Sequence, residues 1–168
     1  SLRYTPKANY NGSDKLTMFT TDGGNSGTGG TLSDTDEMTI SVNAVNDAPV
    51  NTVPLTTQNT NEDTALSLAG LAIADADAGS GTLTVTLAVD RGTLAVSGGT
   101  ATISNSGTNS VTITGTLTQI NATLSAANGV IYTPSLNYNG PATLTMTTSD
   151  GGNSGGANQS TTSTVAFS

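Results

Sequence analysis

Apolar residues alternate with polar or small ones along much of this chain, with a period of two. Between Thr82 and Val89, four apolar residues fall on one face of an extended segment: Leu83, Val85, Leu87 and Val89. Side chains of a β-strand point alternately to opposite faces, so this pattern predicts a strand with one buried face.

Similar segments follow one another at intervals of about 8–12 residues, separated by clusters of Gly, Asn, Asp and Ser that favour turns. This spacing is typical of a β-sandwich. We therefore predict an all-β fold, an antiparallel sandwich, whose strands are Leu66–Leu68 with Leu71–Ala74, Thr82–Val89, Gly92–Val96, Thr100–Ser104, Ser110–Thr114, Val130–Thr133, Thr143–Thr148 and Thr162–Ser168. Two further strands, Lys15–Thr21 and Glu37–Asn43, precede them and flank the glycine-rich stretch "DGGNSGTGGTLSD".

One stretch, "TLTQINATLSAANG", departs from the period of two. Its apolar residues recur at intervals of three and four, as on one face of a helix: Leu117, Ile120 and Leu124. Thr116 and Gln119 have the spacing of a capping box, and Gly129 lies where a C-terminal glycine is common. We predict one short helix of about three turns that lays its apolar stripe on the core.

The chain contains an internal repeat. Tyr4–Gly27 and Tyr132–Gly155 are identical at 17 of 24 positions and lie 128 residues apart. A repeat of this length corresponds to one domain. We therefore expect residues 1–45 to be the C-terminal strand pair of a preceding repeat, and residues 46–168 to be a complete sandwich repeat.

Composition excludes several classes of function. The chain has no Cys and no His, which removes disulfides, thiolate and imidazole metal ligands, Cys nucleophiles and His-based triads. A net charge of -8 with only four basic residues argues against nucleic-acid binding. No apolar stretch reaches the roughly 20 residues of a membrane helix, so we expect no membrane insertion by this segment.

Five motifs carry a resemblance to a known family when they are taken in order. They are "VNDAPV", "NEDTAL", "IADADAGSGTLTVTL", "YTPSLNYNG" and "SDGG". Together they resemble the tandem cadherin-like or Ig-like repeats of very large bacterial surface and secreted adhesins. The resemblance implies an Ig/cadherin-like sandwich and an extracellular or cell-surface location.

The resemblance also implies calcium. In cadherin-like repeats, the interdomain linker, the loop after the second strand and the loop before the last strand meet at one end of the sandwich and bind Ca²⁺. The matching residues are Asn43, Asn46 and Asp47 in the linker, Asp75 and Asp77 in the first loop, and Asp150 in the second. Calcium binds 6–8 oxygen atoms and needs no nitrogen or sulfur, which suits a chain without His or Cys.

A simpler interpretation of the same residues stays open. Asp and Asn are common in turns because their side chains bond to the backbone two residues further on, and Asp-x-Asp-x-Gly forms a good turn without a metal. Asn43 and Asn46 also stand where the family pattern has acids. A site with less negative charge would bind fewer calcium ions or bind them more weakly.

Three further acidic residues are weaker candidates for metal binding. Glu62 and Asp63 match an acidic pair that lies, in the family, at the opposite end of the domain and serves the next linker. Asp22 matches Asp150 through the repeat, but the loops that would complete its site would precede Ser1.

We expect a non-enzymatic module, a calcium-stiffened structural or adhesive spacer of a large bacterial surface protein. An alternative is a subunit of an extracellular filament or sheath, assembled by β-strand complementation through residues 1–45. A carbohydrate-binding module is a second alternative, which the absence of Trp weakens. The expected partners are neighbouring repeats or copies of the chain, with a surface glycan or protein as a possible ligand. No nucleophile has a base beside it, and the carboxylate pair Asp75 and Asp77 has no aromatic-lined cleft, so we expect no enzyme.

Overall fold

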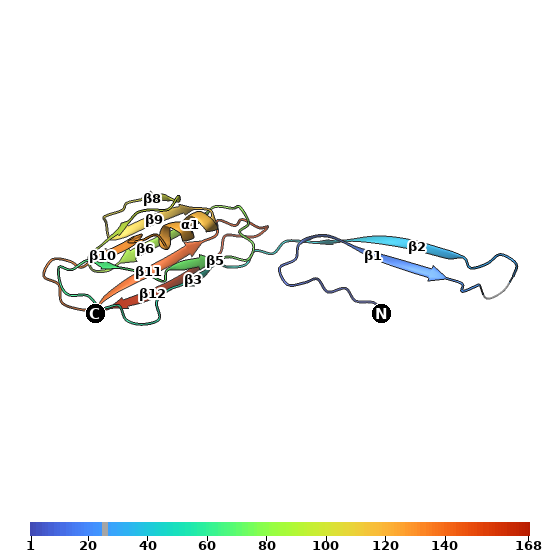
Figure 1. Cartoon of the computed structure of the whole chain (residues 1–168), viewed down its shortest axis with the longest axis horizontal. Coiled ribbons are helices and arrows are strands. Elements are labelled where there is room, and N and C mark those ends of the chain that lie inside the picture. The colour runs from blue at the N-terminus through green and yellow to red at the C-terminus, as the bar shows by residue number, and fades with distance from the viewer. Residues whose placement is uncertain (25–26) are drawn as a thin grey trace. The chain divides into compact units, whose positions relative to one another are not determined.

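The computed structural model describes residues 1–24 and 27–168 of the chain. The chain divides into two compact units, Ser1–Val45 and Asn46–Ser168, which we call unit 1 and unit 2 (Figure 1). Residues 25–26, within the predicted glycine-rich stretch, lie outside the described part.

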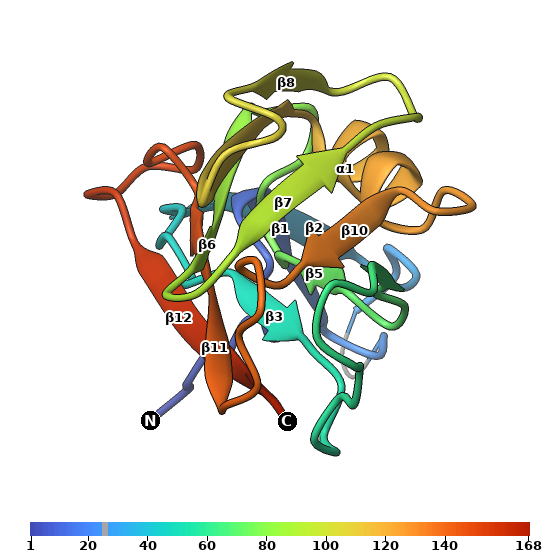
Figure 2. The same ribbon diagram turned by 90° about the vertical axis from the view of Figure 1, so that its left-hand side faces the viewer.

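Unit 2 is a two-layered all-β sandwich, which confirms the predicted fold class. Its larger layer is a five-stranded antiparallel sheet in the order β12-β11-β6-β9-β8, formed by β6 (Leu83–Val89), β8 (Thr102–Ser104), β9 (Ser110–Gly115), β11 (Ala142–Ser149) and β12 (Ser160–Phe167). The facing layer has the order β4-β10-β7, formed by β4 (Leu66–Ser67), β7 (Thr93–Val96) and β10 (Val130–Thr133). Figure 2 shows β7 and β10 side by side in this layer.

A two-stranded ribbon of β3 (Val50–Thr52) and β5 (Ala72–Ala74) completes the sandwich. The sequence pattern missed β3, because three residues are too few to show an alternation. The side chain of Asn51 fixes this strand instead: its amide donates to the carbonyls of Met146 and Thr161, both at 3.1 Å, and accepts from the Thr148 hydroxyl at 2.6 Å. Asn51 therefore ties β3 to both β11 and β12.

The two predicted segments between residues 66 and 74 belong to different sheets. Leu66 in β4 pairs with Tyr132 in β10, whereas Ile73 in β5 pairs with Asn51 in β3. The chain passes from one sheet to the other between them, and the buried side chains of Leu68 and Leu71 lie in the core.

The predicted helix is present as α1 (Leu117–Leu124), and its capping box is confirmed. The Thr116 hydroxyl accepts from the Gln119 N–H at 3.4 Å, and the Gln119 side chain accepts from the Thr116 N–H at 2.9 Å. The helix has eight residues, about two turns, and so is shorter than predicted. It ends at the C-cap Ser125, four residues before Gly129, so Gly129 is not its C-terminal glycine.

The helix covers one edge of the sandwich. Ile120 and Leu124 are buried in the core. Asn121 projects to β5, where its amide nitrogen donates to the Ile73 carbonyl at 2.8 Å and its oxygen accepts from the Ile73 N–H at 2.9 Å. This side chain satisfies the backbone of Ile73 on the edge of β5 that faces the helix.

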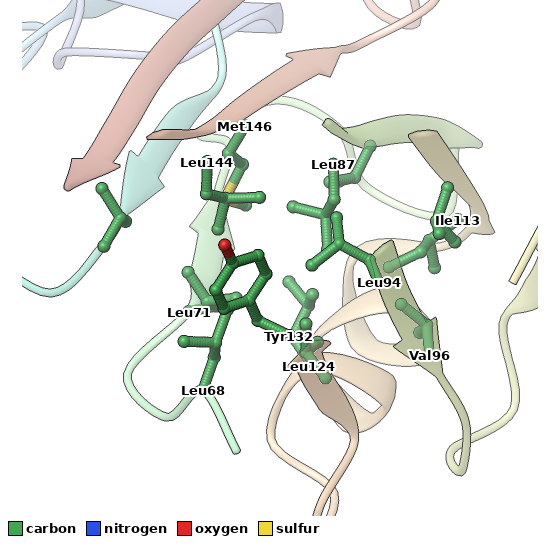
Figure 3. Packing of buried hydrophobic residues seen from close by; sticks show 14 of the residues in the cluster. Leu68, Leu71, Leu87, Leu94, Val96, Ile113, Leu124, Tyr132, Leu144 and Met146 are labelled. Carbon is green, nitrogen blue, oxygen red and sulfur yellow. The ribbon is translucent and has the colours of Figure 1, made fainter. Parts of the chain in front are cut away.

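The core lies between the two layers (Figure 3). Leu87, Ile113, Leu144 and Met146 of the five-stranded sheet are completely buried and face Leu94 of β7. Tyr132 of β10 stacks on Phe167 of β12, with ring centroids 4.2 Å apart. The alternation in β6 and β11 is thus explained by one buried face on each strand, as the sequence predicted.

Unit 1 is a long antiparallel hairpin of β1 (Gly12–Thr21) and β2 (Ser33–Val42). Leu16 lies opposite Met38 on one face of this hairpin. On the other face, Lys15 forms an ion pair with Glu37 at 2.8 Å.

The hairpin of unit 1 is a second copy of β11–β12. Thr21 pairs with Ser33, as Ser149 pairs with Ser160, so the copies are offset by 128 residues in the first strand and by 127 in the second. The loop of unit 1, residues 22–32, is therefore one residue longer than the loop 150–159 of unit 2.

The two copies differ in burial. Met146 and Val165 are buried in the core of unit 2, whereas their counterparts Met18 and Met38 are 57% and 56% exposed. Unit 1 thus presents to solvent the face that unit 2 buries.

The capping box gives a first prediction. Thr116→Ala removes the side chain that accepts from the Gln119 N–H, and we expect it to lower the free energy of unfolding by about 1 kcal/mol. Thr118→Ala, at an exposed position of the same helix, serves as the control and should leave stability within about 0.5 kcal/mol. Urea denaturation followed by circular dichroism measures both, and an equal loss in the two variants would contradict the capping role.

Candidate metal centre

Polar side chains from separate segments meet at the end of unit 2 where the chain enters it. Asn46, the first residue of unit 2, donates from its amide to Asp150 Oδ2 at 2.6 Å and to the Ala157 carbonyl at 3.0 Å. The N–H of Asp47 donates to Asp77 Oδ2 at 3.0 Å. The structure therefore brings two of the three predicted linker residues, Asn46 and Asp47, to the predicted acidic loops.

The first loop follows β5 and folds around Asp75. Asp75 Oδ1 accepts from the N–H of Asp77 at 3.1 Å and from the N–H of Ala78 at 2.9 Å. These bonds are those of an Asx turn, as the simpler interpretation of the sequence predicted. They use only one of the two carboxylate oxygens of Asp75.

Asp150 follows β11 and is completely buried. Its Oδ1 accepts from the N–H of Gly152 at 2.8 Å and from the N–H of Gln159 at 2.9 Å, while Oδ2 accepts from Asn46. Burial by itself would raise the pKa of Asp150, but the hydrogen bonds to the charged form outweigh it and the pKa is lowered. Asp150 is thus held as a carboxylate that closes the β11–β12 loop.

Three buried oxygens of this cluster have no hydrogen-bond partner among the described residues. They are Asn46 Oδ1, Asp75 Oδ2 and Asp77 Oδ1. Buried polar atoms are usually paired, and each orphaned one costs about 1–3 kcal/mol. All three are acceptors, so the group that would satisfy them is a donor or a cation.

The electrostatics of the cluster point the same way. Burial and the neighbouring Asp77 carboxyl both raise the pKa of Asp75. The Asp77 carboxylate therefore disfavours negative charge on Asp75. A bound cation would relieve this repulsion.

The oxygen donors fit a hard cation such as Ca²⁺. Asn46, Asp75 and Asp77 would hold it, and it would supply positive charge between carboxylates and an amide oxygen. No group of three or more His, Cys, Asp or Glu side chains placed to hold a metal occurs in residues 1–24 and 27–168. The three oxygens of this cluster come from only two carboxylates and one amide.

Two residues that support the cluster were not predicted. The hydroxyl of Ser154 donates to the Asp77 carbonyl, and the amide of Asn153 donates to the carbonyls of Asp150 and Thr82. Gly81 makes room for this amide, because a Cβ there would lie 2.3 Å from Asn153 Cγ. The identical "DGGNSG" in both copies of the repeat was the available signal.

The weaker candidates lie elsewhere. Asp63 accepts from the Asn137 N–H at 2.9 Å, and Glu62 lines a cavity beside Phe167, at the opposite end of β12 from Asp150. Asn43 follows β2 in unit 1, where it is exposed.

Asp22 repeats the role of Asp150 in its own hairpin. It accepts from the N–H groups of Gly24 and Leu32, at 2.9 and 3.0 Å. The turn function of this aspartate is therefore common to both copies.

Comparison with protein-family models, with curated protein sequences and with solved structures finds no match for this chain. Within the described residues, no helix has the length and apolar character needed to cross a membrane.

The buried carboxylate gives a second prediction. Asp150→Ala leaves the N–H groups of Gly152 and Gln159 and the amide of Asn46 without their acceptor, so we expect a loss of about 3 kcal/mol in unfolding free energy. Asp90→Ala removes an exposed carboxylate that accepts one backbone N–H, from Thr143 at 2.7 Å, and should cost about 1 kcal/mol or less. Urea denaturation compares the two variants. Equal losses would show that burial of Asp150 adds nothing.

Proposed function

We propose that the chain is a non-enzymatic structural module of an extracellular bacterial surface protein, a spacer built from tandem repeats and stiffened by calcium at its junctions. The observation that carries this proposal is the set of three orphaned oxygens on Asn46, Asp75 and Asp77. Buried polar atoms in folded proteins are usually paired, so such a set calls for an explanation. A divalent cation would pair all three.

The position of the cluster supports a role at the junction. Asn46 and Asp47 are the first residues of unit 2, and they bond to Asp150 and Asp77 of its two loops. A cation that binds these residues would fix the path by which the linker enters the sandwich.

The repeated hairpin supports the tandem arrangement. Both copies have the same strand pairing and an aspartate at the start of the loop. The face that is buried in unit 2 carries apolar side chains in both copies. Two copies in one chain are the pattern expected of a repeat array, in which each unit contacts its neighbours.

Calcium should raise the melting temperature of the chain. At a calcium concentration about 100 times the Kd, linkage stabilises the folded state by about 2.7 kcal/mol, which corresponds to a rise of roughly 10 °C for a domain of this size. Differential scanning calorimetry in calcium and in chelator measures the shift. Superimposable curves would refute the calcium site.

The site can be tested further with the double substitution Asp75→Asn and Asp77→Asn. Because it removes the repulsion between two carboxylates, it should melt no lower than the wild type in chelator, yet it should gain nothing from calcium. The matched control is Glu62→Gln, an exposed acid at the other end of unit 2, which should keep the full calcium response. NMR relaxation of the two units in calcium and in chelator then reports whether the junction stiffens.

A second candidate function is assembly through unit 1. Within the described residues, β1 pairs only with β2, whereas the equivalent strand β11 also pairs with β6. A strand from another copy of the chain could pair with the free edge of β1. It would also cover the exposed apolar face of the hairpin, which carries Met18 and Met38.

One residue sets a limit on this partner. Asp14 stands at the position of the buried Ala142, and it accepts from the Tyr4 hydroxyl at 2.8 Å. This bond raises the pKa of Tyr4 to about 12 and lowers that of Asp14. A strand bound over this face of unit 1 would therefore meet the polar Tyr4–Asp14 pair where unit 2 has a buried alanine.

The assembly function predicts a difference between the two faces of the hairpin. Met18→Lys places a charge on the face that corresponds to the core of unit 2 and should abolish concentration-dependent association. Phe19→Lys alters an equally exposed apolar residue on the opposite face and should leave association unchanged. Sedimentation velocity measures both, and a wild-type chain that stays monomeric at high concentration would rule out assembly.

A further inference from the structure

A cavity of about 590 Å³ lies at the end of unit 2 where β12 ends. Phe167 and Ser168 line it together with two stretches of backbone, residues 60–62 and residues 139–141. The cluster of Asn46, Asp75 and Asp77 does not involve this cavity, and of the weaker metal candidates Glu62 alone lines it.

The two backbone stretches flank the path along which β12 would continue. On one side, Ser168 donates to the Gln58 carbonyl at 3.0 Å and its carbonyl accepts from the Thr60 N–H at 3.2 Å, in a parallel pairing. On the other side, Phe167 pairs with Ala142 in an antiparallel ladder. The register of both ladders places the residue that would follow Ser168 between Thr60 and Gly140.

Unit 1 contains the same hairpin with this path filled. Its pair Asp14 and Ile40 is equivalent to Ala142 and Phe167, and its ladder runs two pairs further, ending with Gly12 opposite Val42. Gly12 is the counterpart of Gly140. The residue that would follow Ser168 therefore corresponds to Val42.

A glycine, Gly140, lines the cavity opposite the path of the strand. A Cβ on Gly140 would lie 2.8 Å from the hydroxyl of Tyr138, so a side chain here would require the tyrosine ring to move, whereas a Cβ on Gly12 would lie 3.8 Å from the Tyr10 hydroxyl. The Tyr138 hydroxyl donates to the Pro141 carbonyl at 2.8 Å, as Tyr10 does to Ser13 at 2.7 Å beside Gly12. Both copies thus keep a glycine and a tyrosine at the place where the opposite strand arrives.

The lining favours an apolar side chain. Residues two apart on a strand point to the same face. The residue after Ser168 lies two positions beyond Phe167, so its side chain would point to the same side as that of Phe167. This is the position equivalent to Val42. The stacked rings of Tyr132 and Phe167 lie on that side, and Glu62 stands at the lining with a negative charge. An acidic side chain would be repelled here.

We propose that an extension of β12, a segment equivalent to Val42–Val45, carries a valine whose side chain has its seat in the part of this cavity beside Phe167. The proposal rests on the tandem arrangement in the proposed function but not on its calcium. The valine anchors the linker to the unit that it leaves, while Asn46 and Asp47 anchor it to the unit that it enters. Only three residues, Asn43–Val45, then separate the two anchors.

The test is to append the tetrapeptide Val-Asn-Ala-Val to the C-terminus and to compare it with an appended Asp-Asn-Ala-Val, both in chelator. The valine extension should raise the melting temperature by about 5 °C over the unextended chain, because an apolar side chain is buried. The aspartate extension should give no rise. The methyl resonances of the first appended valine should shift through ring currents of the nearby aromatic side chains, with nuclear Overhauser contacts to Tyr132 or Phe167.

Equal melting temperatures for the two extensions, with valine methyl shifts at random-coil values, would overturn the proposal. A folded amide spectrum of unit 2 in both extended chains shows that neither extension prevents folding. Because chelator is present throughout, failure here leaves the calcium site untouched, and loss of the calcium response in the wild type leaves this seat untouched.

Discussion

The structure of unit 2 depends on one buried carboxylate. Asp150 receives hydrogen bonds from both ends of its own loop and from Asn46, so a single side chain closes the β11–β12 hairpin and holds the entry of the chain. Of the two strands that this loop joins, β12 is an edge of the five-stranded sheet and β11 is a neighbour of β6. Without this acceptor the loop would have to bury its N–H groups unpaired.

The same constraint explains why the neighbouring acids are unusual. Asp75 and Asp77 are brought next to Asn46 and Asp47 because the loops meet where the chain enters, and the loop geometry consumes only part of their oxygen atoms. The turn interpretation and the calcium interpretation are therefore not exclusive. The turn fixes the position of each aspartate, and the oxygens that the turn does not use are those that would face a cation.

The alternation of apolar residues predicted the long strands β6, β11 and β12 well, because each has one face against the core. The capping box predicted the start of α1, but Gly129 did not mark its end. This residue is a glycine because a Cβ there would collide with the carbonyl of Thr123. β3 escaped prediction because Asn51, through side-chain bonds to distant strands, determines it. The acids of the cluster could be named from the motif order, whereas Asn153 and Ser154 resembled ordinary loop residues.

The repeat carries more information than either copy alone. Unit 2 shows what covers the apolar face that unit 1 exposes, and the hairpin of unit 1 runs two residue pairs beyond the pair equivalent to Ala142 and Phe167. Under the proposal for the end of β12, the linker would have one anchor at the position of Val42 and the other at Asn46. A three-residue segment held at both ends has little freedom, since its closure entropy is largely spent before any cation binds. If the proposed anchor holds, packing at the end of β12 would limit how far the linker can move, and calcium would add rigidity to a segment that is already short.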